Sequence, residues 1–373
     1  MTKINLKISS LRKLKSISQK QLADTLGVSY QTVSKWENGI CMPDITLLPA
    51  ISEYFKVSVD ELLGLKPLNE VDYIPSKTDT KDYWDSKMEY LKRTRNSFWN
   101  LDYIKFLVKD VWKINRKVDI IDFGCGYGFL GQLLLPMLPK GSTYTGIDIN
   151  DKLINEANAL FENCEYKTKF ILKNINDFKP DRTYDIAICQ AFLRHMNNPV
   201  NILENMIKSV KSGGLVICIE VNREIESDGL YVDGIDYSFL CKRNGYEKLW
   251  KKELETQGRD YAIGIKIPVI MNKLGLKNVE VRVNDKVNFI QPNRADYKEV
   301  LNDFIISKDL KEEYRFNENN KLIESLMNHG MDKNDAENSL NKNKKISNHI
   351  YNNIHDLSIL HLYGLLISYG LKP

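Results

Sequence analysis

The stretch Val118–Leu130, VDIIDFGCGYGFL, decides the fold that this sequence predicts. It begins as a largely apolar run, typical of a buried strand, and glycines then occupy positions 124, 126 and 128. Helical spacing follows from Phe129. A buried strand that enters a glycine turn and then a helix is typical of the first strand of a doubly wound α/β sheet. Glycine permits the tight turn and lets a ligand approach the backbone, and the following helix N-terminus favours an anionic group.

The spacing of these glycines narrows the choice of ligand. A dinucleotide fingerprint would need glycine at position 129, which is Phe, and no Gly-Lys-Ser/Thr follows to make a phosphate-binding P-loop. The pattern Asp122-x-Gly124-x-Gly126-x-Gly128 instead resembles motif I of class I S-adenosylmethionine (SAM) dependent methyltransferases. This resemblance implies that the turn packs against the methionine end of SAM and that Asp122 helps to orient it. The alternative is a glycine turn without a ligand.

Later positions extend the resemblance. Asp148 ends the next predicted strand, where a carboxylate can accept both ribose hydroxyls of an adenosine, and Ile149 would pack on the adenine. After the strand predicted at Lys169–Leu172 the family usually has an acidic residue. Asn174 stands there instead, and its amide oxygen can accept the same hydrogen bond from the adenine amine. The resemblance therefore implies cofactor binding by Asp122, Gly124, Gly126, Gly128, Asp148, Ile149, Asn174, Ile175, Gln190 and Ala191.

A fourth strand is predicted at Asp185–Gln190, and His195 follows it at the histidine of the family's Leu-x-His ending. Its ordinary pKa lies near neutrality, so His195 is a candidate general base; the alternative is a histidine that holds the loop by hydrogen bonds. Cys189-Gln190 is similar to the Pro-Cys-Gln loop of cytosine-5 DNA methyltransferases. Residue 188 is Ile rather than Pro, however, and Cys189 belongs to an apolar strand, so nucleic-acid methylation is the less favoured reading.

The rest of this region predicts a Rossmann-like α/β fold with a seven-stranded class I methyltransferase sheet. Strands five and six are expected at Leu215–Val221 and Val279–Val283. The apolar ending HLYGLLISYGLKP is expected to form an antiparallel strand seven between them. Residues 222–277 and 293–356 would add an inserted and C-terminal helical cap. Such insertions build the substrate pocket in small-molecule methyltransferases, which makes Arg223, Tyr231 and Tyr237 candidate pocket residues.

Residues 1–66 predict a small, separate all-α domain. Ser18 is placed to cap one helix, Gly27 makes a tight turn, and Ser29 is placed to cap a second helix that ends near Gly39. The run SQKQLADTLGVSYQTVSKWENG closely resembles the Cro/C1-type (XRE family) helix-turn-helix, whose second helix enters the DNA major groove. The resemblance implies DNA contacts by Gln19, Tyr30, Gln31, Thr32, Ser34 and Lys35. It also implies a homodimer on paired half-sites, although no dimer seam is evident in the sequence.

Composition bounds the remaining properties. A linker is expected at residues 67–80 and the methyltransferase domain at residues 81–373. The net charge of +4 is too small to indicate nucleic acid by itself. The six cysteines contain no Cys-x-x-Cys, which favours a reducing cytoplasm and no metal site. No apolar run reaches membrane-spanning length, so a cytoplasmic protein without a membrane partner is expected.

These patterns favour a SAM-dependent methyltransferase that acts on a small molecule and carries its own DNA-binding module, which would regulate transcription. The alternative is a transcriptional regulator whose methyltransferase-like domain only senses SAM or another ligand. Both hypotheses require the same cofactor site, but only the first requires the chain to transfer the methyl group.

Overall fold

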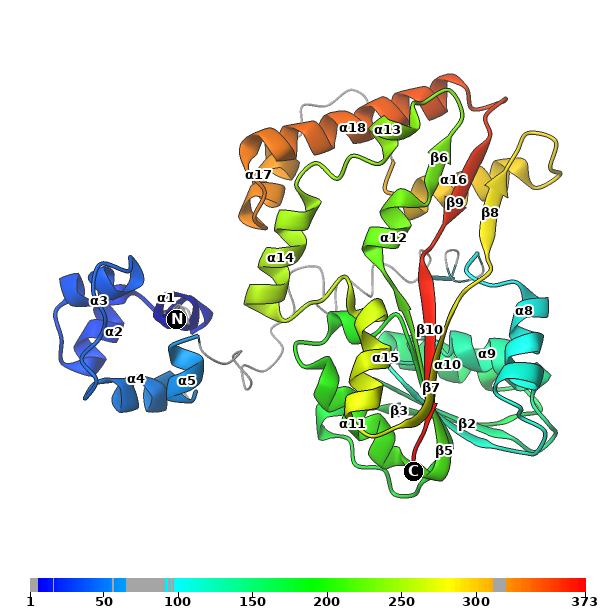
Figure 1. Ribbon diagram of the computed structural model, residues 1–373, viewed down its shortest axis with the longest axis horizontal. Helices are drawn as coiled ribbons and strands as arrows, with labels where there is room; N and C mark the ends of the chain where they lie inside the picture. Colours follow the sequence, from blue (N-terminus) through cyan, green and yellow to red (C-terminus); the bar gives the residue numbers. More distant parts are fainter. Residues whose placement is uncertain are drawn as a thin grey trace. The chain divides into compact units, whose positions relative to one another are not determined.

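The computed structural model describes residues 6–15, 17–55, 57–64, 91–92, 95, 97–310 and 320–373. The chain forms two compact units, Met1–Ile74 and Pro75–Pro373 (Figure 1). The linker expected at residues 67–80 lies outside the described residues, as do residues 81–90 at the start of the expected methyltransferase domain. None of the described helices is both long enough and apolar enough to span a bilayer.

The first unit is a bundle of short helices around one core. Ser18 caps α2 by accepting a hydrogen bond from the Gln21 amide, and the Gln21 side chain returns the bond to the Ser18 amide. Gly27 ends α2 at a φ of 66°, and Ser29 caps α3. The predicted helix-turn-helix is therefore confirmed. The helices are α1 (Ile8–Leu14), α2 (Gln19–Leu26), α3 (Tyr30–Glu37), α4 (Leu48–Phe55) and α5 (Val59–Leu62).

A seven-stranded sheet organises the second unit, with the order β3-β2-β1-β4-β5-β10-β7. The first five pair in parallel, whereas β10 is antiparallel to both neighbours. This confirms the predicted insertion of the final strand between the fifth and sixth strands of the sheet. The strands are β1 (Asp119–Phe123), β2 (Thr143–Asp148), β3 (Lys167–Leu172), β4 (Tyr184–Gln190), β5 (Val210–Val221), β7 (Lys277–Val283) and β10 (Leu365–Leu371).

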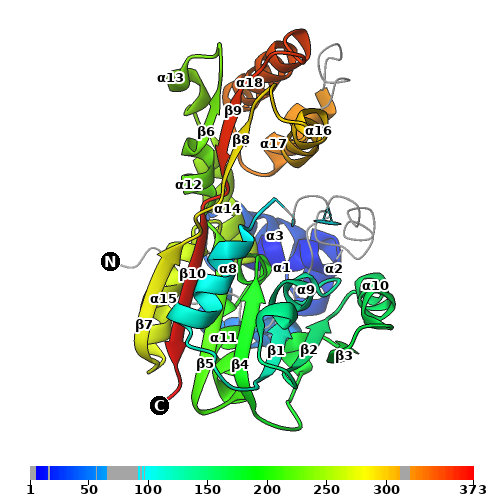
Figure 2. The same cartoon turned by 90° about the vertical axis from the view of Figure 1, so that its right-hand side faces the viewer.

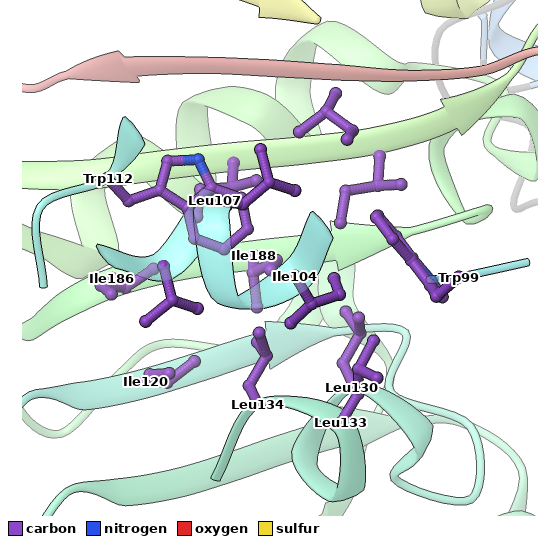
Figure 3. Packing of buried hydrophobic residues seen from close by; sticks show 14 of the residues in the cluster. Trp99, Ile104, Leu107, Trp112, Ile120, Leu130, Leu133, Leu134, Ile186 and Ile188 are labelled. Carbon is purple, nitrogen blue, oxygen red and sulfur yellow. The ribbon is translucent and has the colours of Figure 1, made fainter. Parts of the chain in front are cut away.

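Helices cover both faces because the central strands are apolar on both sides. Ile120 belongs to one core cluster and its neighbour Ile121 to the other, as the alternation of a strand requires. In the first cluster Trp112 and Leu107 pack over the sheet (Figure 3). This face carries α8 (Leu101–Phe106), a π-helical turn (Leu107–Val111), α9 (Phe129–Leu134) and α10 (Asp151–Phe161); the other carries α11 (Pro199–Ser209) and α15 (Ile263–Lys273).

A cap stands beyond the carboxyl ends of the parallel strands (Figures 1 and 2). It contains a second, antiparallel sheet with the order β6-β9-β8, which the sequence did not predict. Its strands are β6 (Leu230–Val232), β8 (Val287–Ile290) and β9 (Ile359–Leu362). Its helices are α12 (Arg223–Asp228), α13 (Tyr237–Leu240), α14 (Tyr246–Gln257), α16 (Tyr297–Ser307), α17 (Asn320–Asn328) and α18 (Lys333–Asn352).

One expectation needs correction. The apolar ending is not a single strand, because Tyr363 and Gly364 separate β9 in the cap from β10 in the main sheet. Gly364 has a φ of 62°, a left-handed conformation that glycine adopts without strain. The chain thereby leaves one sheet and enters the other.

Candidate active site

The three glycines of the turn after β1 all have left-handed backbones, with φ values of 74°, 55° and 84° at Gly124, Gly126 and Gly128. A Cβ on Gly124 would lie 2.2 Å from Cδ2 of Phe192, so this glycine permits close packing against the loop after β4. A Cβ on Gly126 would meet no described atom within 4 Å. The turn is therefore packed at its first glycine and open to a ligand at its second.

Asp148 ties the end of β2 to this turn. Its Oδ2 accepts a hydrogen bond from the Gly126 amide at 2.9 Å, and its Oδ1 accepts one from the Asn150 amide at 2.9 Å. Burial raises the pKa of Asp148, and the bonds from these amides partly offset that effect. The side chain is half-buried, so a ligand can reach it.

Exposed apolar side chains stand beside this carboxylate, where the strands end. Ile149, directly after β2, is 66% exposed, and Leu172, the last residue of β3, is 54% exposed. A carboxylate flanked by uncovered apolar groups suits a nucleoside, because the hydroxyls can donate to the carboxylate while the flat base covers the apolar surface.

The structure also places the residues predicted after β3. Asn174 is exposed, and its Oδ1 accepts a hydrogen bond from the Asn176 amide at 3.0 Å, which caps a short 3₁₀ turn. One lone pair of that oxygen remains available for an adenine amine. Ile175 is only 6% exposed and packs in the core, so it offers little surface to a ligand.

Asp122 is buried beneath the turn, in β1. The Tyr144 hydroxyl donates a hydrogen bond to its Oδ2, while its Oδ1 has no hydrogen-bond partner among the described residues. Burial raises the pKa of Asp122 to about 7, the hydrogen bond from Tyr144 lowers it, and the nearby charge of Asp148 raises it further. Asp122 and Asp148 therefore influence each other electrostatically at the ends of adjacent strands.

The end of β4 carries strain and unpaired polar groups. Ala191 has a φ of 50°, which is uncommon for a residue with a Cβ. Gln190 is 8% exposed, and within the described ranges neither its amide nitrogen nor its amide oxygen has a partner. Each buried polar group left unpaired costs about 1–3 kcal/mol, which a polar ligand at this edge would offset. Gln190 and Ala191 thus lie at the end of the strand next to the one that carries Asp122.

Glu220 holds the loop after β4 in place, and the sequence analysis did not identify it. Its Oε1 accepts hydrogen bonds from the amides of Phe192 at 2.8 Å and Leu193 at 2.6 Å. It is fully buried at the end of β5, and its Oε2 lacks a hydrogen-bond partner in the described part of the chain. The only available signal was a charged residue near the end of the apolar run 215–221.

His195 lies in a 3₁₀ turn after β4, and its Nε2 faces Nε of Arg194 at 3.0 Å. Burial and the neighbouring positive charge of Arg194 hold the pKa of His195 well below its ordinary value. The imidazole is therefore neutral at neutral pH and has little affinity for a proton. This environment favours the loop-holding role over general-base catalysis, which stays a prediction.

Cys189, whose position is similar to the cysteine of the Pro-Cys-Gln loop in cytosine-5 DNA methyltransferases, is fully buried within β4. Burial raises the pKa of its thiol well above the ordinary range. A buried, protonated thiol is a poor nucleophile. The local structure therefore favours a core role for Cys189.

The three candidate pocket residues are not brought together. Arg223 lines a cavity in the cap. Tyr231 is 43% exposed on β6, and Tyr237 is 50% exposed and donates its hydroxyl to the Asp228 carbonyl at 2.8 Å. Neither tyrosine lines the cavity that Arg223 borders.

In the first unit, α3 presents a mixed surface. Tyr30, Gln31 and Lys35 are exposed, whereas Thr32 and Ser34 are half-buried. Exposed side chains on the second helix of a helix-turn-helix can reach base edges. The half-buried Thr32 and Ser34 are better placed to hold the exposed side chains in position.

Gln19 belongs to a separate network that joins α2 to α3. Its Nε2 donates to Oε2 of Glu37 at 2.8 Å, and Arg12 forms an ion pair with the same carboxylate at 2.5 Å. The Gln19 amide is thereby fixed at the start of α2. One amide hydrogen remains for the predicted phosphate contact.

No group of three or more His, Cys, Asp or Glu side chains within the described ranges is arranged to hold a metal ion.

Two family models match parts of the chain. Residues 114–258 match the family model of a methyltransferase domain, and residues 8–62 match that of a helix-turn-helix. The ubiquinone biosynthesis O-methyltransferase of Rickettsia akari is 26% identical over 159 residues, covering 42% of this chain and 61% of the relative. The enzyme of that name from Nitrosomonas europaea is 28% identical over 159 residues, covering 42% of this chain and 64% of the relative. The chain thus spans less than two thirds of the length of these relatives.

Similar solved structures include Haemonchus contortus phosphoethanolamine N-methyltransferase 2 in complex with SAM. It has 13% identity and a TM-score of 0.45, and the match covers 83% of this chain and 61% of that one. The plantazolicin methyltransferase BpumL in complex with S-adenosylhomocysteine has 14% identity and a TM-score of 0.40, covering 78% of this chain and 90% of that one.

Proposed function

We propose that this chain, which joins a class I SAM-dependent methyltransferase domain to a Cro/C1-type helix-turn-helix domain, methylates a small molecule and regulates transcription through DNA binding. The observation that carries the enzyme half is the hydrogen bond from the Gly126 amide to Asp148. It joins the open glycine turn to the strand end where a ribose would be held.

The residues present fit SAM. Asp148 would accept the ribose hydroxyls, and the uncovered side chains of Ile149 and Leu172 would pack on the adenine. The open face of Gly126 and the unpaired polar atoms of Gln190 would receive the polar methionine end. When bound, SAM supplies a methyl group already activated by its sulfonium. The chain's own residues therefore need to bind the two reactants and orient them.

We attribute most of the proposed catalysis to the alignment of SAM with the methyl acceptor. Positioning of two reactants supplies up to about 7–11 kcal/mol of the barrier. Glu220 fixes the loop after β4 through the Phe192 and Leu193 amides, and Phe192 of that loop lies against Gly124 of the glycine turn. Since the neutral His195 is a weak base, the acceptor's proton would pass to solvent rather than to this imidazole.

The DNA-binding half of the proposal is supported by the exposed α3 side chains and by the matched helix-turn-helix. Residues 1–66 also contain nine Lys and Arg against six Asp and Glu, which favours approach to phosphates.

Label transfer tests the proposal. The purified chain and methyl-labelled SAM are incubated with extract of host cells, and small molecules, protein and nucleic acid are then separated. Label in the small-molecule fraction that is absent with Asp148→Ala supports the enzyme. Label in nucleic acid would overturn the choice of substrate. Tight SAM binding without label anywhere would favour the sensor, which then predicts a change of DNA affinity on addition of SAM.

A further inference from the structure

The cap contains a cavity of about 230 Å³ whose lining is strongly basic. Arg223, Lys242, Arg243, Lys308 and Lys342 line it together with one acidic residue, Glu226. Five cations against one carboxylate leave an excess of four positive charges. Asp228 and Glu224 lie outside the lining and pair with Arg243 at 3.2 and 3.8 Å. When these two carboxylates are counted, an excess of two positive charges remains.

The acidic residue of the lining is already bound by two of the cations. Lys308 Nζ lies 2.9 Å from Oε1 of Glu226, and Arg223 pairs with Oε2. Glu226 is 6% exposed, and these positive charges hold its pKa well below the ordinary range despite its burial. This end of the cavity is therefore positive even after internal pairing.

Lys342, on α18, shows the charge excess most clearly. Its ammonium donates hydrogen bonds to the carbonyls of Leu240 and Lys242. No carboxylate of the described residues lies within ion-pair distance of it. Its side chain is half-buried, and burial lowers its pKa. A charge withdrawn from water and held only by carbonyls is stabilised when an anion arrives.

Aromatic and aliphatic groups complete the lining. Tyr246 and Trp250 come from one face of α14, with ring centroids 6.1 Å apart, and Tyr261 stacks on Trp250 at 5.9 Å. Leu310 and Ile346 add aliphatic surface. A binding site with an apolar wall and a few convergent charges favours a molecule with an apolar body and a charged group.

Arg223, which lines this cavity, lies three residues beyond Glu220, the residue that binds the loop after β4. It follows β5 by two residues, and its charge adds to the effect of burial, which lowers the pKa of both Arg194 and His195 in the loop after β4. A ligand held at Arg223 would therefore lie beside the loop that borders the proposed cofactor site.

We propose that the cap cavity binds the methyl acceptor through an anionic group, and that the acceptor is a small carboxylate or phosphate ester with an aromatic or aliphatic body. The inference rests on the proposed function, because it concerns the substrate of that reaction. Arg223 and Lys342 hold the anion, and Trp250 and Tyr246 contact the body.

Binding of matched probes to the full chain tests this site without requiring turnover. Benzoate, phenyl phosphate and the neutral benzamide are titrated calorimetrically in a buffer free of phosphate. We expect at least one anion to bind about tenfold or more tightly than benzamide, as for a charge-assisted hydrogen bond. Preference for benzoate assigns a carboxylate, and preference for phenyl phosphate a phosphate ester.

Lys342→Met keeps the length of the side chain and removes its charge, while Lys251→Met changes an exposed lysine of α14 outside the lining. We expect Lys342→Met to weaken anion binding about tenfold and leave SAM affinity unchanged, and Lys251→Met to change neither. Equal affinities for anions and benzamide, or an unaltered anion affinity in Lys342→Met, would overturn the site.

Failure of this site and failure of the proposed function give different results. Label transfer to a neutral molecule without anion binding would refute the anionic acceptor and leave the enzyme. Anion binding without any label transfer would retain the cavity as a ligand site and refute turnover.

Discussion

The Asp148 carboxylate and the Gly126 amide are joined by a hydrogen bond of 2.9 Å that links the end of β2 to the turn after β1. We propose that each residue holds a different part of a nucleoside-containing cofactor. The bond therefore sets the spacing of two subsites, and a change at Asp148 acts on both.

Asp148→Ala should weaken SAM binding about 10- to 100-fold, because it removes a charged acceptor and releases the Gly126 amide. Calorimetric titration measures the change, and circular dichroism verifies the fold. Asp181→Asn, which alters an exposed carboxylate before β4, should retain the wild-type affinity. An unchanged affinity in folded Asp148→Ala would contradict the assignment.

The first two glycines of the turn should respond differently to alanine. Both have left-handed backbones, which cost roughly 1–2 kcal/mol for a residue with a Cβ. Gly124→Ala adds a clash with the Phe192 ring, so its melting temperature should fall further than that of Gly126→Ala. Gly126→Ala should fold, because its methyl group meets no neighbouring atom. It should lose SAM affinity, because this methyl group enters the space that we propose for the cofactor. Equal decreases of the melting temperature in the two variants, or full SAM affinity in Gly126→Ala, would refute this distinction.

Asp122 should make the ligand-free protein less stable as the pH rises from about 4 to about 7. Burial raises its pKa from 3.8 to about 7, so the folded state retains a proton that the unfolded state has lost. Since each pH unit in this window is worth about 1.4 kcal/mol, Asp122→Asn should gain roughly 3 kcal/mol over wild type between pH 5 and 8. Urea unfolding at pH 5 and pH 8 measures the free energy of unfolding of both proteins. An equal change between the two pH values in wild type and Asp122→Asn would contradict the prediction.

Gln31→Ala should reduce DNA affinity by about 1–3 kcal/mol and relax the preference at one base pair, because we propose that this exposed side chain of α3 reads a base edge. Lys35→Ala should act similarly at a neighbouring position. Fluorescence anisotropy on a duplex selected from a random library by the wild-type chain provides the measurement. Lys20→Ala on α2 is the matched control, and a loss equal to that of Lys35→Ala would point to nonspecific charge instead.

The sheet could be predicted because its signals are local. Apolar runs mark β1 and β4, and the glycine turn after β1 fixes where the sheet begins. The cap sheet could not be predicted in this way. Its strand β6 has three residues, and Leu230 pairs with His361, far along the chain. Short strands with remote partners leave no periodicity to read.

The site shows the same division. Asp148 and Gln190 could be placed because each ends a recognisable strand. Glu220 could not, because its role depends on the Leu193 amide, which the fold rather than the local sequence brings within 2.6 Å. Sequence reasoning predicts Asp151 as the cap of a helix that starts at Lys152, and this is wrong by one residue: Asn150 accepts a hydrogen bond from the Leu153 amide and caps α10, while Asp151 is its first residue.

The passage of the chain from β9 into β10 has a consequence for the order of folding. β9 is the middle strand of the cap sheet, and β10 lies between β5 and β7 in the main sheet. Neither sheet can close until residues 359–371 leave the ribosome. During synthesis the facing edges of β5 and β7 therefore stay unpaired until this segment arrives, and both sheets are completed by the same late segment.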